Sequence, residues 1–232
     1  MPSDSAAGLD LLIFDCDGVL VDSEVLSGRA VAEALAAIGH PVSLESLTER
    51  FLGMSVKDMY AALERERGAV LPASFDAEMN RLATALFERE LRAMRGLESA
   101  LAALAEPRCV ASSSTPAMLA WKLAWAGLAP WFGGAVFSTA EVARGKPAPD
   151  IFLHAAERMG AAPARVLVVE DSPLGITAAK AAGMIAFGFT GGSHCRAGHS
   201  ERLAAAGADL VFAEMSELPE RLAQRKATFT TS

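Results

Sequence analysis

Two aspartates, one residue apart, directly follow an apolar segment near the start of the chain. The segment LDLLIF leads into Asp15, Cys16 and Asp17. Alternate residues of a strand point to the same face, about 6.6 Å apart, so Asp15 and Asp17 should project together while Cys16 points away. We therefore interpret Cys16 as a small buried apolar residue and not as a nucleophile. Burying the two carboxylates costs on the order of several kcal/mol unless they are paired or bound to a metal, so the pattern predicts a cation beside them.

A second acidic pair and a serine follow two other apolar segments. Glu170 and Asp171 come after RVLVV, and Ser112 comes after RCVA. Ligands of parallel α/β sheets bind outside the carboxyl ends of the strands, so these side chains should meet Asp15 and Asp17 at one edge. Four carboxylates there would repel one another and force some of them to protonate. Mg²⁺ binds through one or two carboxylates, waters and substrate phosphate, and it would remove this repulsion. The sequence thus predicts a magnesium site.

Two further features would suit a phosphate group. The segment SSSTP precedes a helical pattern, with Thr115 as the expected N-cap and Pro116 in the first turn. It can be a plain capping segment, and it can also bind an anion at the helix N-terminus with Ser112 donating a hydrogen bond. Lys146, in GKPAPD, lies in a loop before another helical pattern. It is either a solvated lysine or the cation that the acidic edge needs.

The elements that would position these residues fall into two groups. From about Pro107 onward, short apolar segments alternate with helical patterns, which is typical of βαβ units and a parallel sheet. Residues 22–94 instead hold four helical patterns and no convincing strand: SGRAVAEALAAIG, SLESLTERF, VKDMYAALERERG and SFDAEMNRLATALFERELRAM. We expect an α/β core formed by residues 1–21 and 95–232 with a smaller helical domain formed by residues 22–94. The alternative is that these helices simply pack on the sheet.

Composition narrows the class of protein. The chain has 232 residues, of which 52% are apolar and 21% charged, so it can bury a core and should be globular. A net charge of −7 argues against general nucleic-acid binding. Its three cysteines show no CxxC spacing, which suits a reducing compartment. The start, MPSDSAAG, lacks the features of a signal peptide, and no apolar run reaches the ~20 residues of a membrane helix. We expect a soluble, cytoplasmic protein that binds neither nucleic acid nor membrane.

Four segments together resemble the ordered motifs of the haloacid dehalogenase (HAD) superfamily. They are FDCDGVLVDSE, VASSS, GKPAPD and EDSPLGITAAKAAG. The resemblance implies an α/β fold with a Rossmann-like parallel-sheet core and a small all-helical cap domain inserted after the first motif. That subgroup includes β-phosphoglucomutases, phosphoglycolate phosphatases and sugar-phosphate phosphatases.

The resemblance also implies catalytic and metal-binding roles for individual residues. Asp15 would be the nucleophile that takes the phosphoryl group, and Asp17 the general acid/base whose backbone carbonyl also ligates Mg²⁺. Ser112 and Lys146 would hold phosphate oxygens. The metal ligands would be Asp15, Asp17, Glu170 and Asp171, with Glu170 as a direct or outer-shell ligand. An aspartate at position 17 favours phosphate-ester chemistry over dehalogenation, because dehalogenases of this superfamily lack it.

The cap should choose the substrate. RFLGMSVKDMY resembles the specificity loop of the β-phosphoglucomutases, and the predicted substrate-binding residues are Gly53, Ser55, Lys57, Ser112, Ser113 and Lys146. The mutases carry an arginine where this chain has Val56 and a histidine where it has Ser27. Both differences weaken the interpretation of this chain as a mutase. Other stretches look closer to 6-phosphogluconate phosphatases. We expect a Mg²⁺-dependent phosphatase of a small sugar or sugar-acid phosphate, as a monomer or homodimer, with β-phosphoglucomutase as the alternative.

Two other interpretations are weaker. A phosphoacceptor signalling module also gathers acidic residues and a lysine at a sheet edge, but such modules are about half this length, lack a helical insert and do not carry a DxD pair. The segment HCRAGH contains two histidines and a cysteine that could hold a soft metal ion. We interpret it as a polar loop after glycines.

Overall fold

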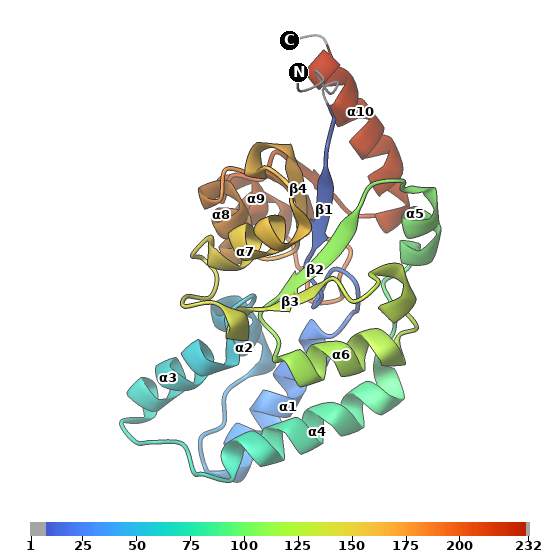
Figure 1. The fold of residues 1–232 in the computed structure, drawn as a ribbon. Coiled ribbons are helices and arrows are strands. Elements are labelled where there is room, and N and C mark those ends of the chain that lie inside the picture. Colours follow the sequence, from blue (N-terminus) through green and yellow to red (C-terminus); the bar gives the residue numbers. More distant parts are fainter. Residues whose placement is uncertain (1–7, 231–232) are drawn as a thin grey trace.

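A computed structural model describes residues 8–230, and its centre is a six-stranded parallel sheet (Figure 1). The strands lie in the order β3-β2-β1-β4-β5-β6. Their bounds are Leu11–Phe14 (β1), Arg108–Ser112 (β2), Val136–Ser138 (β3), Val166–Glu170 (β4), Ile185–Phe189 (β5) and Leu210–Phe212 (β6). The apolar segments that precede Asp15, Ser112 and Glu170 in the sequence form β1, β2 and β4, as predicted. The predicted α/β fold class is confirmed.

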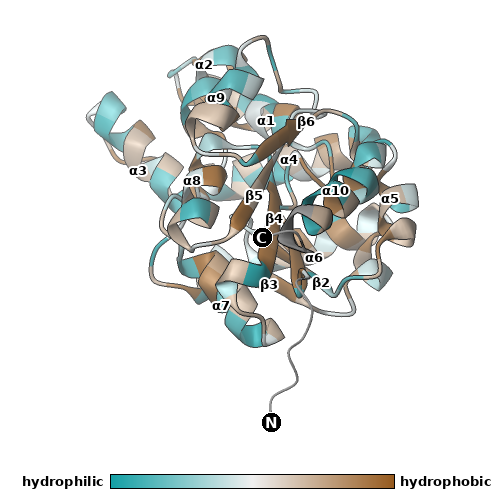
Figure 2. Cartoon of the chain, turned by 90° about the horizontal axis from the view of Figure 1, so that it is seen from above, coloured by the Kyte–Doolittle hydropathy of each residue, from teal (hydrophilic) through white to brown (hydrophobic). Residues whose placement is uncertain are grey.

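The central strands are apolar along their whole length because helices cover both faces of the sheet. In β1, Leu11 and Ile13 pack toward one side, and Leu12 and Phe14 pack toward the other. The first side is covered by α7 (Asp150–Met159), α8 (Pro173–Ala181) and α9 (His199–Ala205). The second is covered by α5 (Leu97–Ala103), α6 (Pro116–Trp125) and α10 (Leu218–Thr230). Figure 2 shows the hydrophobic strands enclosed between these layers. This burial explains why their sequences do not alternate between apolar and polar residues.

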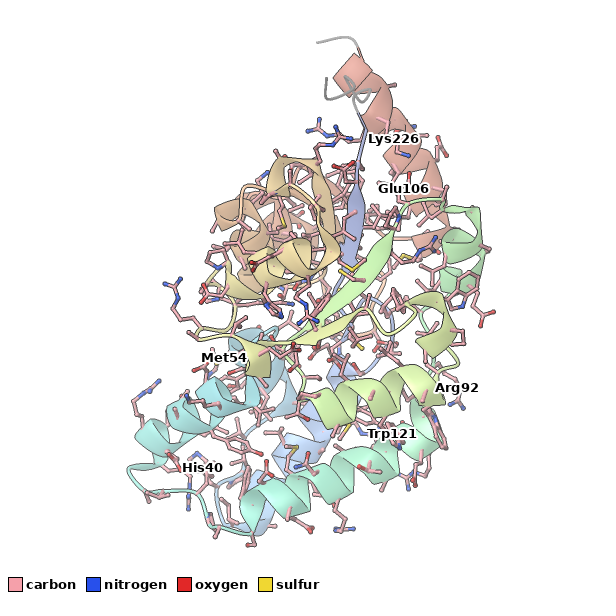
Figure 3. The ribbon with its side chains drawn as sticks, in the orientation of Figure 1. His40, Met54, Arg92, Glu106, Trp121 and Lys226 are labelled. Atoms are coloured by element: carbon pink, nitrogen blue, oxygen red, sulfur yellow. The ribbon has the colours of Figure 1, made fainter. Side chains whose placement is uncertain are left out.

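Four further helices form a group beyond the carboxyl ends of β1, β2 and β3 (Figure 1). They are α1 (Glu24–Ala37), α2 (Leu44–Phe51), α3 (Val56–Arg67) and α4 (Phe75–Glu90). Helix α1 packs along α4 and against α2. Trp121 of α6 lies between α6 and α4, with its ring centroid 6.1 Å from that of Phe87 (Figure 3). Helix α4 and the core thus share apolar packing.

The chain enters and leaves this helical group through two adjacent extended segments. The backbone N–H of Asp22 donates to the carbonyl of Arg92 at 3.1 Å, and that of Met94 donates to the carbonyl of Leu20 at 2.8 Å. The sequence pattern predicted that the last helix continues to Met94, but α4 ends at Glu90. Its continuation is extended because the backbone there pairs with the incoming segment, an arrangement that periodicity within one segment cannot reveal.

Short elements complete the fold. Four single-turn 3₁₀ helices are formed by residues Ala129–Trp131 (η1), Thr139–Glu141 (η2), Pro163–Arg165 (η3) and Met215–Glu217 (η4). Helix α5 was not among the predicted elements, whereas Thr115 caps α6 as predicted, its hydroxyl accepting a hydrogen bond from the N–H of Met118. Among residues 8–230, no helix is both long and apolar enough to cross a bilayer.

Candidate active site

Lys146 lies at the centre of a buried group of charges at the carboxyl edge of the sheet. Its Nζ donates to Asp15 Oδ1 at 2.9 Å and to Glu170 Oε1 at 2.6 Å. The side chains of Lys146 and Glu170 are fully buried, and that of Asp15 is 7% exposed. Asp15 follows β1 and Glu170 ends β4, which is the strand paired with β1. The loop before α7 thus delivers a cation to the ends of two neighbouring strands.

One carboxylate at this edge keeps an unsatisfied oxygen. Oxygens of Asp15, Glu170 and Asp171 all lie within 4.8 Å of one another. Glu170 is satisfied by the protein, because Lys146 holds Oε1 and the N–H and hydroxyl of Ser172 both donate to Oε2 at 2.9 Å. Asp171 Oδ2 is buried and makes no regular hydrogen bond among the described residues, although His194 Nε2 lies 3.0 Å from it. Carboxylate oxygens are the ligands that a hard divalent cation prefers, so this group of residues fits such an ion.

The charges at this edge are not balanced by protein groups. Three carboxylates share one lysine, so the cluster would carry two excess negative charges if all three were ionised. Burial raises the pKa of Asp15 well above its ordinary range, and Glu170 and Asp171 raise it further against the opposing effect of Lys146. Burial and the charge of Glu170 likewise raise the pKa of Asp171. A divalent cation carries the charge that this cluster lacks.

Asp17 lies beside this cluster but has different partners. Ser23 donates to its Oδ1 at 2.5 Å, Ser114 donates to its Oδ2 at 2.7 Å, and Ser112 approaches Oδ2 at 3.4 Å. The Nζ of Lys122, from α6, is hydrogen-bonded to Asp17 Oδ1. Burial alone would raise the pKa of Asp17, but the charge and hydrogen bonds of Lys122 with those of the serines lower it. The pKa of Asp15 is therefore raised and that of Asp17 lowered, although only one residue separates the two aspartates.

Two glycines allow the backbone to approach these carboxylates. Gly18 has φ of +74°, and a Cβ at this position would lie 1.8 Å from Asp171 Oδ2. A Cβ at Gly175, in the first turns of α8, would lie 1.8 Å from Glu170 Oε1. Any larger residue would collide with a carboxylate of the cluster, so both positions require glycine.

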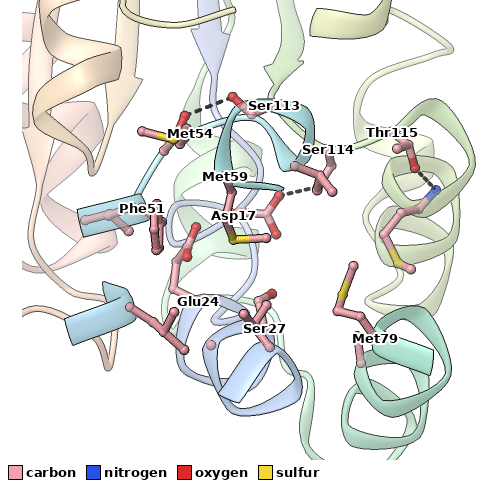
Figure 4. A pocket seen from close by; sticks show the side chains of 18 of the residues that line it. Asp17, Glu24, Ser27, Phe51, Met54, Met59, Met79, Ser113, Ser114 and Thr115 are labelled. Carbon is pink, nitrogen blue, oxygen red and sulfur yellow. Dashed lines mark hydrogen bonds between the residues drawn. The ribbon is translucent and has the colours of Figure 1, made fainter. Parts of the chain in front are cut away.

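A pocket leads from Asp15 and Asp17 into the group formed by α1 to α4 (Figure 4). Gly53 lines it, and the Gly53 carbonyl accepts a hydrogen bond from Ser113 Oγ at 3.1 Å. This bond joins the loop after α2 to the loop after β2. The predicted substrate-binding residues Gly53 and Ser113 are therefore in contact at the pocket.

Ser55 and Lys57, also predicted to bind substrate, line an adjoining groove that also includes Lys146. Ser55 caps α3, with its hydroxyl donating to Asp58 Oδ2 at 2.6 Å. Lys57 is exposed. Neither lines the pocket that leads from the aspartates into the helices.

Sequence reasoning missed four residues of the site: Glu24, Ser114, Lys122 and His194. Lys122 had a usable signal, since it is a lone charge on an otherwise apolar helix. His194 Nε2 lies 3.0 Å from Asp171 Oδ2 and 3.3 Å from Cys195 Sγ. Burial lowers the pKa of His194. The predicted polar loop thus has one fully buried histidine side chain directed at the acidic cluster, which the sequence did not reveal because loop length does not fix loop direction.

Comparison with known proteins places the chain in a family. Residues 9–183 match the haloacid dehalogenase-like hydrolases. The chain is 29% identical over 213 residues to the 6-phosphogluconate phosphatase of Escherichia coli (strain K12), covering 91% of this chain and 94% of that protein.

Two crystal structures are close to this fold. A haloacid dehalogenase-like protein from Agrobacterium tumefaciens str. C58 is 42% identical, with a TM-score of 0.81 and coverage of 94% of this chain and 99% of the other. A HAD family hydrolase from Deinococcus radiodurans R1, solved with bound phosphate and sodium, is 31% identical with a TM-score of 0.73, covering 96% and 98% of the two chains. The motifs, the fold and these similarities agree: the chain belongs to the haloacid dehalogenase-like hydrolases.

Proposed function

We propose that the protein is a Mg²⁺-dependent phosphatase that hydrolyses a small phosphorylated metabolite of the sugar-phosphate class. The observation that carries this proposal is the carboxylate of Asp15, which is held by Lys146 next to an acidic cluster that fits a divalent cation and which lines a pocket. The phosphatase activity of the Escherichia coli relative supports it. So does the phosphate bound to the structure from Deinococcus radiodurans.

In this proposal Asp15 is the nucleophile. A carboxylate that is ionised in the loaded site needs no base to activate it. Lys146 holds one oxygen of Asp15, and the other oxygen attacks phosphorus. A bond forms between Asp15 and phosphorus as the bond from phosphorus to the leaving alkoxide breaks. Lys146 and the hydroxyls of Ser112 and Ser113 would bind the phosphoryl oxygens and stabilise their charge.

Asp17 would then move protons. It donates one to the leaving alkoxide, and it later accepts one from the water that hydrolyses the aspartyl-phosphate, which regenerates Asp15 and releases phosphate. The serines around Asp17 offer it alternative hydrogen bonds while it carries no proton. The proton that Asp17 accepts from water is the one that it donates to the alkoxide in the next turnover, so Asp17 would begin each turnover protonated. Its lowered pKa favours the ionised form that acts between the two steps.

We propose that Asp15, the backbone carbonyl of Asp17 and Asp171 hold the magnesium ion directly. Glu170 would be an outer-shell group, since its oxygens are already bound by Lys146 and Ser172. When bound, Mg²⁺ supplies positive charge that offsets the repulsion between the attacking carboxylate and the phosphate dianion.

Residues 22–94 would act as the cap that encloses the alcohol part of the substrate, on a core formed by residues 1–21 and 95–232. The two paired segments around Asp22 and Arg92 would be the linkers between them. Gly53 is the cap residue with the strongest support for contact with the reacting group, through its hydrogen bond with Ser113. Ser55 and Lys57 would bind substrate only from the adjoining groove.

The β-phosphoglucomutase alternative is not favoured. A mutase must hold a second phosphate in the pocket, and the basic residue that lines it among the described residues, Lys122, is bound to Asp17. The histidine of the mutases is replaced by Ser27, which lines the pocket here.

A screen of phosphorylated metabolites for released phosphate tests the proposal. With Mg²⁺, we expect hydrolysis of several sugar phosphates and of a generic aryl phosphate. Incubation with β-glucose 1-phosphate and a trace of glucose 1,6-bisphosphate separates the two functions. Free phosphate is expected, and glucose 6-phosphate as the main product would contradict a phosphatase.

A further inference from the structure

The pocket that leads away from Asp15 is mostly apolar where it passes between the helices. Its far walls are formed by side chains of all four helices, among them Val31, Leu47, Phe51, Ala83 and Phe87. These five side chains are almost entirely buried, each at most 9% exposed. A surface of this kind removes carbon atoms of a ligand from water and gains about 25 cal/mol per Å² by doing so.

Four methionines from four different segments contribute to this pocket. They are Met54 from the loop after α2, Met59 from α3, Met79 from α4 and Met118 from α6. Figure 4 shows Met59 near Asp17 and Met79 on the opposite wall. Methionine side chains are flexible and polarizable, so they adapt to irregular carbon surfaces and make favourable contacts with aromatic rings.

No free cation faces this space from the described residues that line it. Lys122, the one basic residue among them, is hydrogen-bonded to Asp17 and to Ser114. Arg50, at the end of α2, is paired with Glu66 and does not line the pocket. Lys57 lines the adjoining groove instead. A second anionic group of a substrate would therefore be buried here without a partner, which is costly.

Neutral polar groups are present in small number. Asn80 donates to Asp76 at 3.1 Å, which leaves its own carbonyl oxygen as an acceptor, and the hydroxyl of Thr48 donates to the carbonyl of Leu44. Both residues line the pocket. They can hydrogen-bond to a hydroxyl group of a ligand but cannot neutralise a charge.

We propose that the alcohol part of the substrate is uncharged and presents a carbon-rich face, such as the face of a sugar ring or an aromatic group. Sugar-acid phosphates and bisphosphates are thereby excluded as preferred substrates. This inference rests on the proposed function, because it assigns the other end of the substrate to Asp15. It separates this chain from its relative that is named a 6-phosphogluconate phosphatase.

A matched pair of phosphonates tests this inference without hydrolysis. Pentylphosphonate and 4-carboxybutylphosphonate have similar length and differ by a terminal carboxylate. We expect the full chain loaded with Mg²⁺ to bind pentylphosphonate at least about tenfold more tightly in calorimetry. Equal affinity, tighter binding of the carboxylate or failure of both probes to bind would overturn the inference.

A substitution in the pocket provides a second test of this inference. Met59 is half-buried on α3 and lines the pocket, so Met59→Lys adds a cation to the pocket wall. We expect Met59→Lys to reduce or reverse the preference for pentylphosphonate, while Met59→Leu keeps it. An unchanged preference in Met59→Lys, with a melting temperature like that of Met59→Leu, would also overturn the inference.

Hydrolysis assays distinguish this inference from the proposed function. We expect glucose 6-phosphate to be hydrolysed with at least about tenfold higher kcat/KM than 6-phosphogluconate. If no monoester is hydrolysed but pentylphosphonate is preferred, the proposed function fails and the pocket assignment stands. If monoesters are hydrolysed and 6-phosphogluconate is preferred, the proposed function stands and this inference fails.

Discussion

The ammonium group of Lys122 is hydrogen-bonded to the carboxylate of Asp17, and both groups are withdrawn from solvent. The side chains are 4% and 14% exposed, and 105 residues separate them in the sequence. Lys122 reaches Asp17 from α6, while Ser23 reaches the same carboxylate from the start of α1. Asp17 is thus bound by α6 and by the residue that precedes α1 at once.

Removing this lysine should destabilise the protein. Lys122→Met leaves the buried Asp17 carboxylate without its cation, and breaking such a pair costs about 3–5 kcal/mol of unfolding free energy. The melting temperature should fall by about 6 °C or more. Lys180→Met is the matched control, because Lys180 pairs with Asp209 at the surface and its loss should cost about 1 kcal/mol or less. Equal effects of the two variants would contradict a buried pair.

Asp15 and Cys16 should differ sharply in their importance for activity. Asp15→Asn removes the attacking carboxylate and should lower kcat for an aryl phosphate by at least about 1000-fold. Cys16 is fully buried, and burial raises the pKa of its thiol well above the ordinary range, so it is neutral. Cys16→Ser should keep most of the activity of the folded protein. A comparable loss in both variants would refute the assigned nucleophile.

Magnesium should be required, and its ligands should differ in importance. A chelator should abolish hydrolysis, and added Mg²⁺ should restore it. Loss of an outer-shell group such as Glu170 costs about 10–100-fold in metal affinity, and loss of a direct ligand such as Asp171 should cost more. Asp171→Asn should therefore raise the Mg²⁺ concentration for half-maximal activity more than Glu170→Gln does. The measurement is activity against Mg²⁺ concentration for each variant. Full activity in chelator would exclude the metal role.

Gly18 offers a test of the close approach to Asp171. Gly18 and Gly39 both have φ of +74°, but a Cβ at Gly39 meets nothing within 4 Å, whereas one at Gly18 lies 1.8 Å from Asp171 Oδ2. Alanine at either position costs about 1–2 kcal/mol for the left-handed backbone. Only Gly18→Ala should also displace Asp171, with a loss in kcat/KM of about 100-fold. Similar kinetics of the two variants would contradict this prediction.

The carboxyl group of Glu24 should make stability depend on pH. Burial raises its pKa from 4.5 to about 8, and Asp171 and Asp17 contribute to the shift. Between pH 4.5 and 8 the folded protein keeps this proton while the unfolded chain releases it, so the unfolding free energy falls as pH rises through this window. In chelator, the melting temperature of Glu24→Gln minus that of wild type should therefore increase from pH 5 to pH 9.

Glu33→Gln is the control for that measurement, since Glu33 is exposed on the same helix. An equal pH-dependent gain in Glu33→Gln would contradict a specific role of Glu24. A constant difference between Glu24→Gln and wild type would show that Glu24 does not hold a proton in the folded state.

The sequence by itself determined the strands, the α/β fold class and the gathering of Asp15, Glu170 and Asp171 at one edge. It left open whether Lys146 joins them. Buried parallel strands are short apolar runs that can be recognised locally, and the carboxyl ends of such strands always meet at one edge. Residues that directly follow a strand are therefore placed by the fold class alone. The ordered motifs added the family, which the comparisons confirmed.

Only the tertiary structure decided which groups surround Asp17 and what lines the pocket. Lys122 lies on a helix and His194 in a loop, and their directions depend on how these elements pack, which periodicity does not encode. The same holds for α4, which ends at Glu90 because residues after it pair with the segment around Val21. Contacts between distant segments are fixed by packing in three dimensions, so the substrate-selecting part of the site could not be predicted from local sequence patterns.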